Sequence, residues 1–241
     1  MKTGNPFGLK TPAFVMLVVL AFSSGCMTAR PIPINAQAEN LHIDPSSRSP
    51  LNVAVVVPDP HGHRIMMGMS MVNLLGHDMM TPKTADQTNV FHGEAGMPVG
   101  RELAKVAGET FSQVFDHAIV MRQQPPPGEY DAIIQVNVTE VKVLSFYKRG
   151  GLEGTTEVAL DWRLSVMDGQ GVEMLSRKDL TPVESYSIPV SLSFDPAMDA
   201  MGAAISKVIT RMVKEWGMML SSSEELRAYS KRRKTGSEKR P

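Results

Sequence analysis

The sequence predicts an α+β domain, in which a mainly antiparallel or mixed sheet of about four to six strands is packed by two amphipathic helices. Three patterns carry this prediction. Apolar residues recur at three- and four-residue steps from Val99 to Phe115, and again from Met201 to Met219. Between these helical stretches, large apolar side chains occupy every second position from Val158 to Val166, as in a strand with one buried face.

The remaining strands are predicted from short apolar or β-branched runs. They lie at residues 51–57, 118–121, 131–146 and 172–176, with 185–194 as an edge strand. Within the long strand the apolar parity changes after Val138, which predicts a β-bulge or a change of packing surface. The first helix is expected over residues 98–116, and the second is expected to begin at Asp195-Pro196, with Asp195 as its cap.

The first 26 residues have the pattern of an export signal. Lys2 and Lys10 precede the apolar run at 13–22, which at about 1.5 Å per residue spans only about half of a ~30 Å bilayer core. A basic start, a short apolar middle and small residues at the end make a secretory signal rather than a membrane-spanning helix. Two small residues, Ser24 and Gly25, directly precede Cys26, the only cysteine in the chain.

This arrangement resembles a bacterial lipoprotein signal, which implies cleavage before Cys26 and attachment of lipid to its sulfur. Ser23 stands where such signals usually have leucine, so an ordinary secreted protein with a free Cys26 thiol is the alternative. A free thiol is unusual in an oxidising compartment, which favours lipidation. Met27 is not the aspartate that retains many lipoproteins at the inner membrane. We therefore expect a lipid anchor in the outer membrane, with the protein on the periplasmic side.

Four regions are expected along the chain: a lipoprotein signal peptide (1–25), a flexible tether (26–50), a single α+β domain (51–220) and a basic disordered tail (221–241). The tether is predicted from its prolines and polar residues, and the tail from its charge. The tail carries a net charge of +4, whereas residues 26–220 carry −6. An acidic body argues against nucleic acid as a partner.

Residues 58–98 are rich in methionine and histidine and fit neither a helix nor a strand pattern well. Thioether and imidazole groups are ligands that suit Cu(I), so one interpretation is a periplasmic site for Cu(I) or Ag(I). Its candidate ligands are His61, His63, Met67, Met69, Met71 and His77. Methionine is abundant throughout, with 18 residues, and it fills irregular cores, so core packing is the favoured interpretation.

No catalytic residue and no cofactor is expected. Gly68-Met69-Ser70 resembles the start of a nucleophile elbow, but the closing glycine is missing. The sequence contains no glycine-rich phosphate loop, HExxH or paired-cysteine metal motif. A non-enzymatic role is therefore predicted.

The order of elements behind the lipid signal resembles a class of small bacterial envelope lipoproteins. These include the lipopolysaccharide-assembly lipoprotein, the YajG-like lipoproteins and the auxiliary lipoproteins of transport systems. The local likeness lies in residues 51–57, in Gly100 and Leu103, and in residues 131–134. The resemblance implies an accessory protein of envelope assembly or transport. We expect it to bind an envelope protein or a second copy of itself, through a sheet edge or residues 58–98. The alternatives are the metal-binding protein and an oligomeric secretion component.

Overall fold

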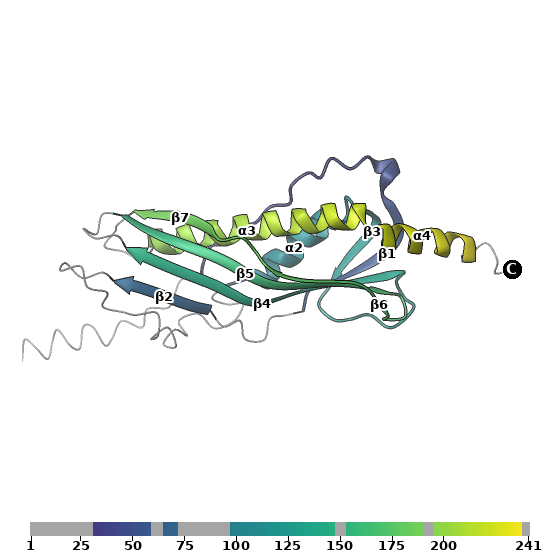
Figure 1. Cartoon of the computed structure of the whole chain (residues 1–241), viewed down its shortest axis with the longest axis horizontal. Helices are drawn as coiled ribbons and strands as arrows, with labels where there is room; N and C mark the ends of the chain where they lie inside the picture. Colours follow the sequence, from purple (N-terminus) through teal and green to yellow (C-terminus); the bar gives the residue numbers. More distant parts are fainter. Residues whose placement is uncertain (1–30, 59–64, 72–96, 148–152, 190–194, 238–241) are drawn as a thin grey trace, which may run out of the picture. The chain divides into compact units, whose positions relative to one another are not determined.

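The computed structural model describes residues 31–58, 65–71, 97–147, 153–189 and 195–237, and it confirms the predicted α+β class (Figure 1). The strands are β1 (Ser49–Val56), β2 (Ile65–Met71), β3 (Phe115–Met121), β4 (Ala132–Tyr147), β5 (Glu153–Asp168), β6 (Glu173–Leu180) and β7 (Glu184–Pro189). The helices are the 3₁₀ helix η1 (Pro45–Ser47) and the α-helices α2 (Val99–Phe111), α3 (Asp195–Ser222) and α4 (Glu224–Ser237).

The described strands form one mixed, seven-stranded sheet in the order β3-β1-β4-β5-β6, with β2 added to β4 and β7 added to β5. Strands β4 and β5 are 16 residues long and pair antiparallel along almost their whole length. Each is long enough to take two partners in succession on its outer side. The first part of β4 pairs in parallel with β1 and the last part with β2, while β5 pairs first with β7 and then with β6.

The predicted bulge lies at the centre of the β4–β5 pair. Its register shifts between Val138 and Glu140. Val138 and Val141 are both buried in the main core, although they are three residues apart. The extra residue therefore returns the apolar side chains of β4 to the same face of the sheet.

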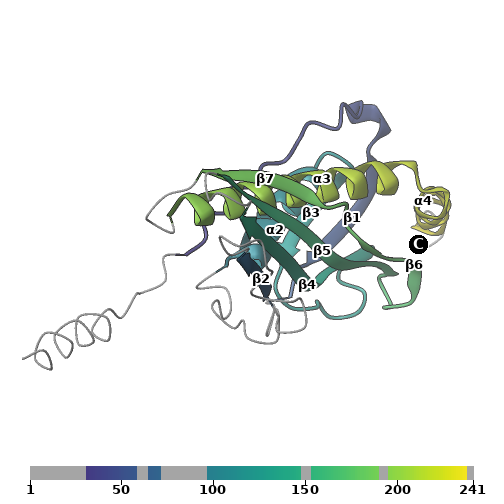
Figure 2. The same ribbon diagram turned by 60° about the vertical axis from the view of Figure 1, so that its left-hand side comes forward.

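The helices α2 and α3 contact each other, and they lie over the same face of the sheet (Figures 1 and 2). Their apolar stripes meet the strands in one main core, which includes Leu103, Ile134, Leu160, Ile205 and Trp216. The opposite face has a smaller cluster of Ala54, Val56, Tyr130 and Ile133. Residues 122–131 join the parallel strands β3 and β4, which flank β1, so this connection has to cross β1.

Two sequence expectations for this part of the fold need correction. The first helix ends at Phe111 rather than at residue 116. Val114 and Phe115, predicted on its apolar stripe, are instead buried from the turn that follows and from the start of β3. Residues 65–71, which fitted neither pattern well, form β2, because the last part of β4 supplies a parallel partner that the local sequence does not reveal.

Candidate functional site

The residues singled out from the sequence lie mostly outside the described part of the chain. This applies to Cys26 and to His61, His63 and His77. The other candidate metal ligands, Met67, Met69 and Met71, take alternate positions along β2. Ser70, of the elbow-like motif, lies within the same strand. Metal binding by this set stays a prediction.

The described residues offer two further observations on these hypotheses. They contain no group of three or more histidine, cysteine, aspartate or glutamate side chains that could hold a metal ion. Among the helices that the structure describes, none combines the length and apolar character needed to cross a membrane.

Residues 31–41, here called the strap, lie along α3 in a regular register. Every second strap residue meets every third or fourth helix residue: Pro33 with Gly202, Asn35 with Ser206, Gln37 with Thr210, Glu39 with Lys214, and Leu41 with Gly217. Two extended residues advance by about 6.6 Å and four helical residues by about 6 Å, so the two repeats match. The helix therefore presents a partner to the strap at each step.

The strap is held by apolar burial as well as by hydrogen bonds. Ile32, Ile34 and Ala36 are buried in the main core. The side of α2 contributes Lys105, which donates to the Ala36 carbonyl. Gln113 accepts from the amide of Leu41 at 2.9 Å and donates to the Glu39 carbonyl at 3.1 Å.

Over residues 31–50 these contacts correct the expectation of a flexible tether, which was predicted for residues 26–50; residues 26–30 lie outside the described part of the chain. From Pro31 onward the described chain is packed on α2 and α3, continues through η1 and enters β1 at Ser49. The signal that could have identified it is the alternation of Ile32, Ile34 and Ala36, which the intervening prolines and polar residues obscure.

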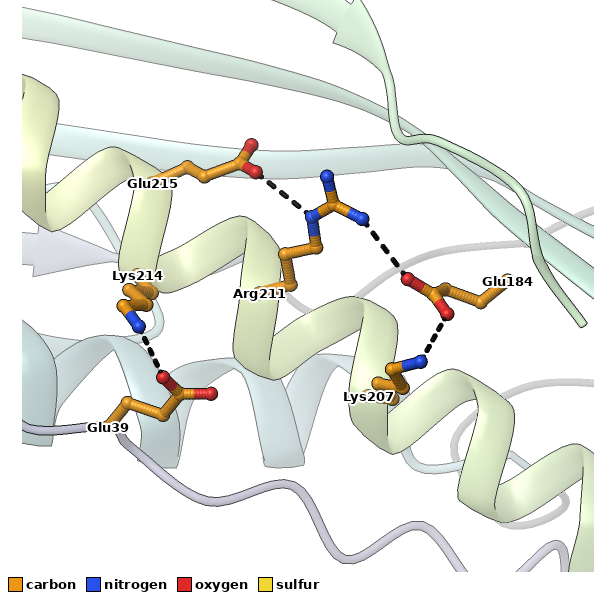
Figure 3. A network of polar contacts seen from close by, with 6 residues as sticks. All are labelled: Glu39, Glu184, Lys207, Arg211, Lys214 and Glu215. Carbon is orange, nitrogen blue, oxygen red and sulfur yellow. Dashed lines mark hydrogen bonds and ion pairs between the residues drawn. The ribbon is translucent and has the colours of Figure 1, made fainter.

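Charged contacts join both the strap and β7 to α3 (Figure 3). Lys214 Nζ lies 2.6 Å from Glu39 Oε2 of the strap. The Glu184 carboxylate of β7 contacts Lys207 at 2.6 Å and Arg211 at 3.2 Å. Arg211 also reaches Glu215 at 3.1 Å, one helical turn away.

The Glu184 carboxylate is the most enclosed charge of this network, with its side chain 12% exposed. The hydrogen bond from Lys207 lowers the pKa of Glu184, burial opposes this by raising it, and the hydrogen bond from Arg211 lowers it further. Glu184 in turn raises the pKa of Lys207. Low exposure and mutual stabilisation of the two charged forms are the properties of a structural ion pair, which here holds β7 against α3.

The expected disordered tail is, over residues 224–237, the helix α4. Ser223 caps its start, because its hydroxyl accepts a hydrogen bond from the amide of Leu226 at 3.3 Å. Glu224 and Glu225 occupy the first turn, where negative charge is favourable. Leu226 is buried, and Tyr229 packs against the main core. The charge count alone predicted disorder, whereas the capping residues and the Leu226–Tyr229 spacing were the local signals of a helix.

Asp131, just before β4, joins α4 to the sheet. Its backbone carbonyl accepts a hydrogen bond of 2.8 Å from the Tyr229 hydroxyl. The Asp131 side chain accepts from the amide of Asn52 in β1 at 3.0 Å and lies 3.7 Å from Nε of Arg233. Arg233 also donates to the Tyr229 oxygen at 3.0 Å. Besides the buried Leu226, the polar side chains of Tyr229 and Arg233 therefore also fix this basic helix on the fold.

A cavity of about 780 Å³ lies beside this junction. Its lining includes Leu51, Met174, Asp131, Asp168, Arg232 and Arg233. The two carboxylates are already used by the fold, because Asp131 accepts from Asn52 and Asp168 accepts from the amides of Gln170 and Val172. The cavity is therefore lined by charges of both signs together with apolar side chains, and its acidic groups hold the backbone in place.

Comparison with known proteins finds resemblance in solved structures only. No protein-family model matches the chain, and no curated protein matches its sequence. A Helicobacter pylori protein described as a neuraminyllactose-binding hemagglutinin homologue is 10% identical, with 82% of this chain and 99% of that chain covered and a TM-score of 0.42.

Two bacterial lipoproteins are also among the similar structures. One, from Caulobacter crescentus, is 12% identical over 52% of this chain and 81% of that chain, with a TM-score of 0.31. A minor lipoprotein from Acinetobacter baumannii is 11% identical over 68% of this chain and 94% of that chain, with a TM-score of 0.34. At such scores these likenesses carry no argument about function.

Proposed function

We propose that this protein is a non-catalytic lipoprotein of the bacterial envelope. In this proposal a lipid on Cys26 anchors it in the outer membrane, and its body faces the periplasm as an accessory of assembly or transport that binds another envelope protein. The observation that carries the proposal is the export signal, in which a short apolar run and small residues lead directly to the single cysteine.

The strap adds a physical consequence to this anchor. The buried residue Ile32 lies only six residues after Cys26. A chain of that length spans at most about 22 Å, because an extended residue covers no more than about 3.6 Å. A lipid on Cys26 would therefore hold the body close to the membrane surface rather than at the end of a long tether.

A non-catalytic role is supported by how three of the described carboxylates are used. Glu184 is bound by two basic residues, and Asp131 and Asp168 accept hydrogen bonds from backbone amides. A general acid or base needs a proton that can be transferred to a substrate, and these carboxylates are committed to holding elements together. Any turnover that purified protein shows, and that depends on its folded body, would contradict this part of the proposal.

The anchor is tested by metabolic labelling with a palmitate analogue, followed by separation of inner and outer membranes. Wild-type protein is expected to be labelled and to sediment with the outer membrane. Cys26→Ser is expected to lose the label and the membrane association. Met27→Asp, which keeps the cysteine, is the matched control and should stay labelled but move toward the inner membrane. Unlabelled wild-type protein in the soluble fraction would overturn the proposal.

The partner is tested by purifying the lipidated chain from membranes, with Cys26→Ser purified in parallel. Assembly or transport proteins that accompany only the lipidated chain would support an accessory role. Copper bound in stoichiometric amount would instead support the His/Met interpretation, and a large ring of this chain alone would support a secretion component.

A further inference from the structure

The strand β3 forms one edge of the described sheet, since it pairs only with β1. Its second half, from Ala118 to Met121, carries no charged side chain. Ile119 is 49% exposed and Val120 is 40% exposed, on opposite faces of this edge, since Ile119 pairs with Ala54 and Val120 with Val55. An open apolar edge is a template for pairing with another strand.

The opposite edge of the sheet is protected in a way that β3 is not. Strand β6 carries Arg177, Lys178 and Asp179 in succession near its end. Charged side chains on an edge strand discourage pairing with another chain. The contrast favours β3 over β6 as an edge that is available for association.

The hydrogen-bonding groups of β3 point the right way for a partner. The amide of Val57, directly after β1, donates to the Met121 carbonyl, so the backbone groups of Met121 face β1. Backbone groups alternate in direction along a strand, so those of Ala118 and Val120 face outward. Hydrogen-bonded partners in an added antiparallel strand therefore have to lie opposite Ala118 and Val120.

We propose that β3 is the interface for a second copy of this chain, through antiparallel pairing of β3 with β3 about a two-fold axis at Ile119. In this register Ala118 lies opposite Val120 of the other copy, which satisfies both outward-facing backbone positions. The two Ile119 side chains become direct neighbours in a non-hydrogen-bonded pair, where the Cα atoms are about 4.5 Å apart.

Charge complementarity selects this register over its neighbours. Pairing centred at Ile119, continued by one residue past the end of β3 at Met121, sets Asp116 of each copy opposite Arg122 of the other, and both side chains are exposed. The next register that keeps the hydrogen bonds is shifted by two residues. In either direction this shift places Asp116 or Arg122 opposite an apolar residue. Two opposite-charge pairs therefore flank the apolar centre symmetrically, as an isologous interface requires.

This pairing goes beyond the proposed anchor and does not depend on it, so the two are tested separately. Ile119→Cys is introduced into the full chain and followed by non-reducing electrophoresis of cells. Two cysteines at the axis meet the distance that a disulfide needs, so a linked dimer of twice the monomer mass is expected. Val172→Cys, at a position that is 62% exposed in the turn after β5, is the matched control and should stay monomeric.

The wild-type chain is run beside these variants, because a linked dimer formed by wild type would reveal a free Cys26 thiol. That result would contradict the lipid anchor, and the pairing would then be measured in a Cys26→Ser chain. Cross-linking of Ile119→Cys no stronger than that of Val172→Cys would overturn the pairing.

The register is tested by sedimentation of the purified mature chain in detergent. Asp116→Lys sets like charges opposite each other at two places and is expected to raise the dimer dissociation constant about tenfold. Adding Arg122→Glu restores opposite charges with reversed signs and should return the constant to within about threefold of wild type. A chain that stays monomeric at all concentrations, or a double variant no better than Asp116→Lys, would overturn the proposal.

Discussion

The backbone amide of Asn35 donates a hydrogen bond of 2.8 Å to the hydroxyl of Ser206, although 171 residues separate them. The same hydroxyl donates to the Gly202 carbonyl of the preceding turn at 2.6 Å. Ser206 therefore uses its donor within the helix and its acceptor on the strap. This contact joins the described segment nearest the proposed lipid anchor to α3, the longest of the described helices.

The fit of the strap predicts that Gly202→Ala destabilises the protein. Alanine normally favours a helix over glycine. Here a Cβ on Gly202 would overlap the carbonyl oxygen of Pro33, which is backbone and cannot rotate away. A loss of about 1–3 kcal/mol in the free energy of unfolding is expected, as for overpacked cores, measured by chemical denaturation.

Gly217→Ala is the matched control for this substitution, because it lies in the same helix and also faces the strap. A Cβ there would meet the ends of the Leu41 and Thr110 side chains at 2.6 and 2.8 Å. Both of these contacts are with side-chain methyl groups rather than with backbone, so a smaller loss than for Gly202→Ala is expected. Equal effects of the two substitutions would contradict the described register.

The position of Glu184 predicts an acid-dependent contribution to stability. Its pKa is lowered from the ordinary value of 4.5 by its hydrogen bond with Lys207. A lowered folded-state pKa stabilises the fold above pH 4.5, and this contribution is lost as the pH falls through the lowered value. Glu184→Gln is therefore expected to lower the melting temperature by a few degrees at pH 7, and this difference should shrink in acid.

Glu215→Gln serves as the control for that titration. The Glu215 side chain is 51% exposed and contacts only Arg211 within the network. An exposed pair of this kind contributes little, so a change below about 0.5 kcal/mol is expected at every pH. A Glu184→Gln difference that grows in acid would contradict the assigned direction of the pKa.

The two tryptophans of the chain, Trp162 and Trp216, form an edge-to-face pair with ring centroids 4.9 Å apart and planes at 64°. Indole rings this close couple their electronic transitions, so wild-type protein is expected to show an exciton couplet in circular dichroism. Trp162→Phe should abolish the couplet and cost about 1 kcal/mol, since phenylalanine keeps most of the contact. A couplet that survives this substitution would contradict the packing of β5 against α3.

The docking of α4 predicts protection of its backbone amides from hydrogen exchange. Leu226→Ala removes its buried anchor and is expected to speed exchange over residues 224–237 about 30-fold, which corresponds to about 2 kcal/mol. Lys231→Ala, at an exposed position of the same helix, should leave the protection unchanged. Exchange at unprotected rates in the wild-type protein would instead favour the disordered tail expected from its composition.

The sequence by itself determined those elements whose own residues show the apolar repeat of a buried face. The alternation along β5, the stripe of α3 with its Asp195-Pro196 start, and the bulge after Val138 could all be predicted. Each of these elements buries enough apolar surface for its period to appear in the sequence. The export signal is local in the same sense, because its charges, apolar run and small residues are contiguous.

Only the tertiary structure decided the strap, the strand β2 and the helix α4. Each of these segments is ordered by a partner far away in the sequence: the strap by α3, β2 by the last part of β4, and Tyr229 of α4 by Asp131, 98 residues before it. A segment without a strong apolar period of its own offsets its lost conformational entropy only when such a partner supplies hydrogen bonds and a buried surface. The local sequence does not show which distant residues a segment will contact. The order of these three segments could therefore be seen only in the tertiary structure.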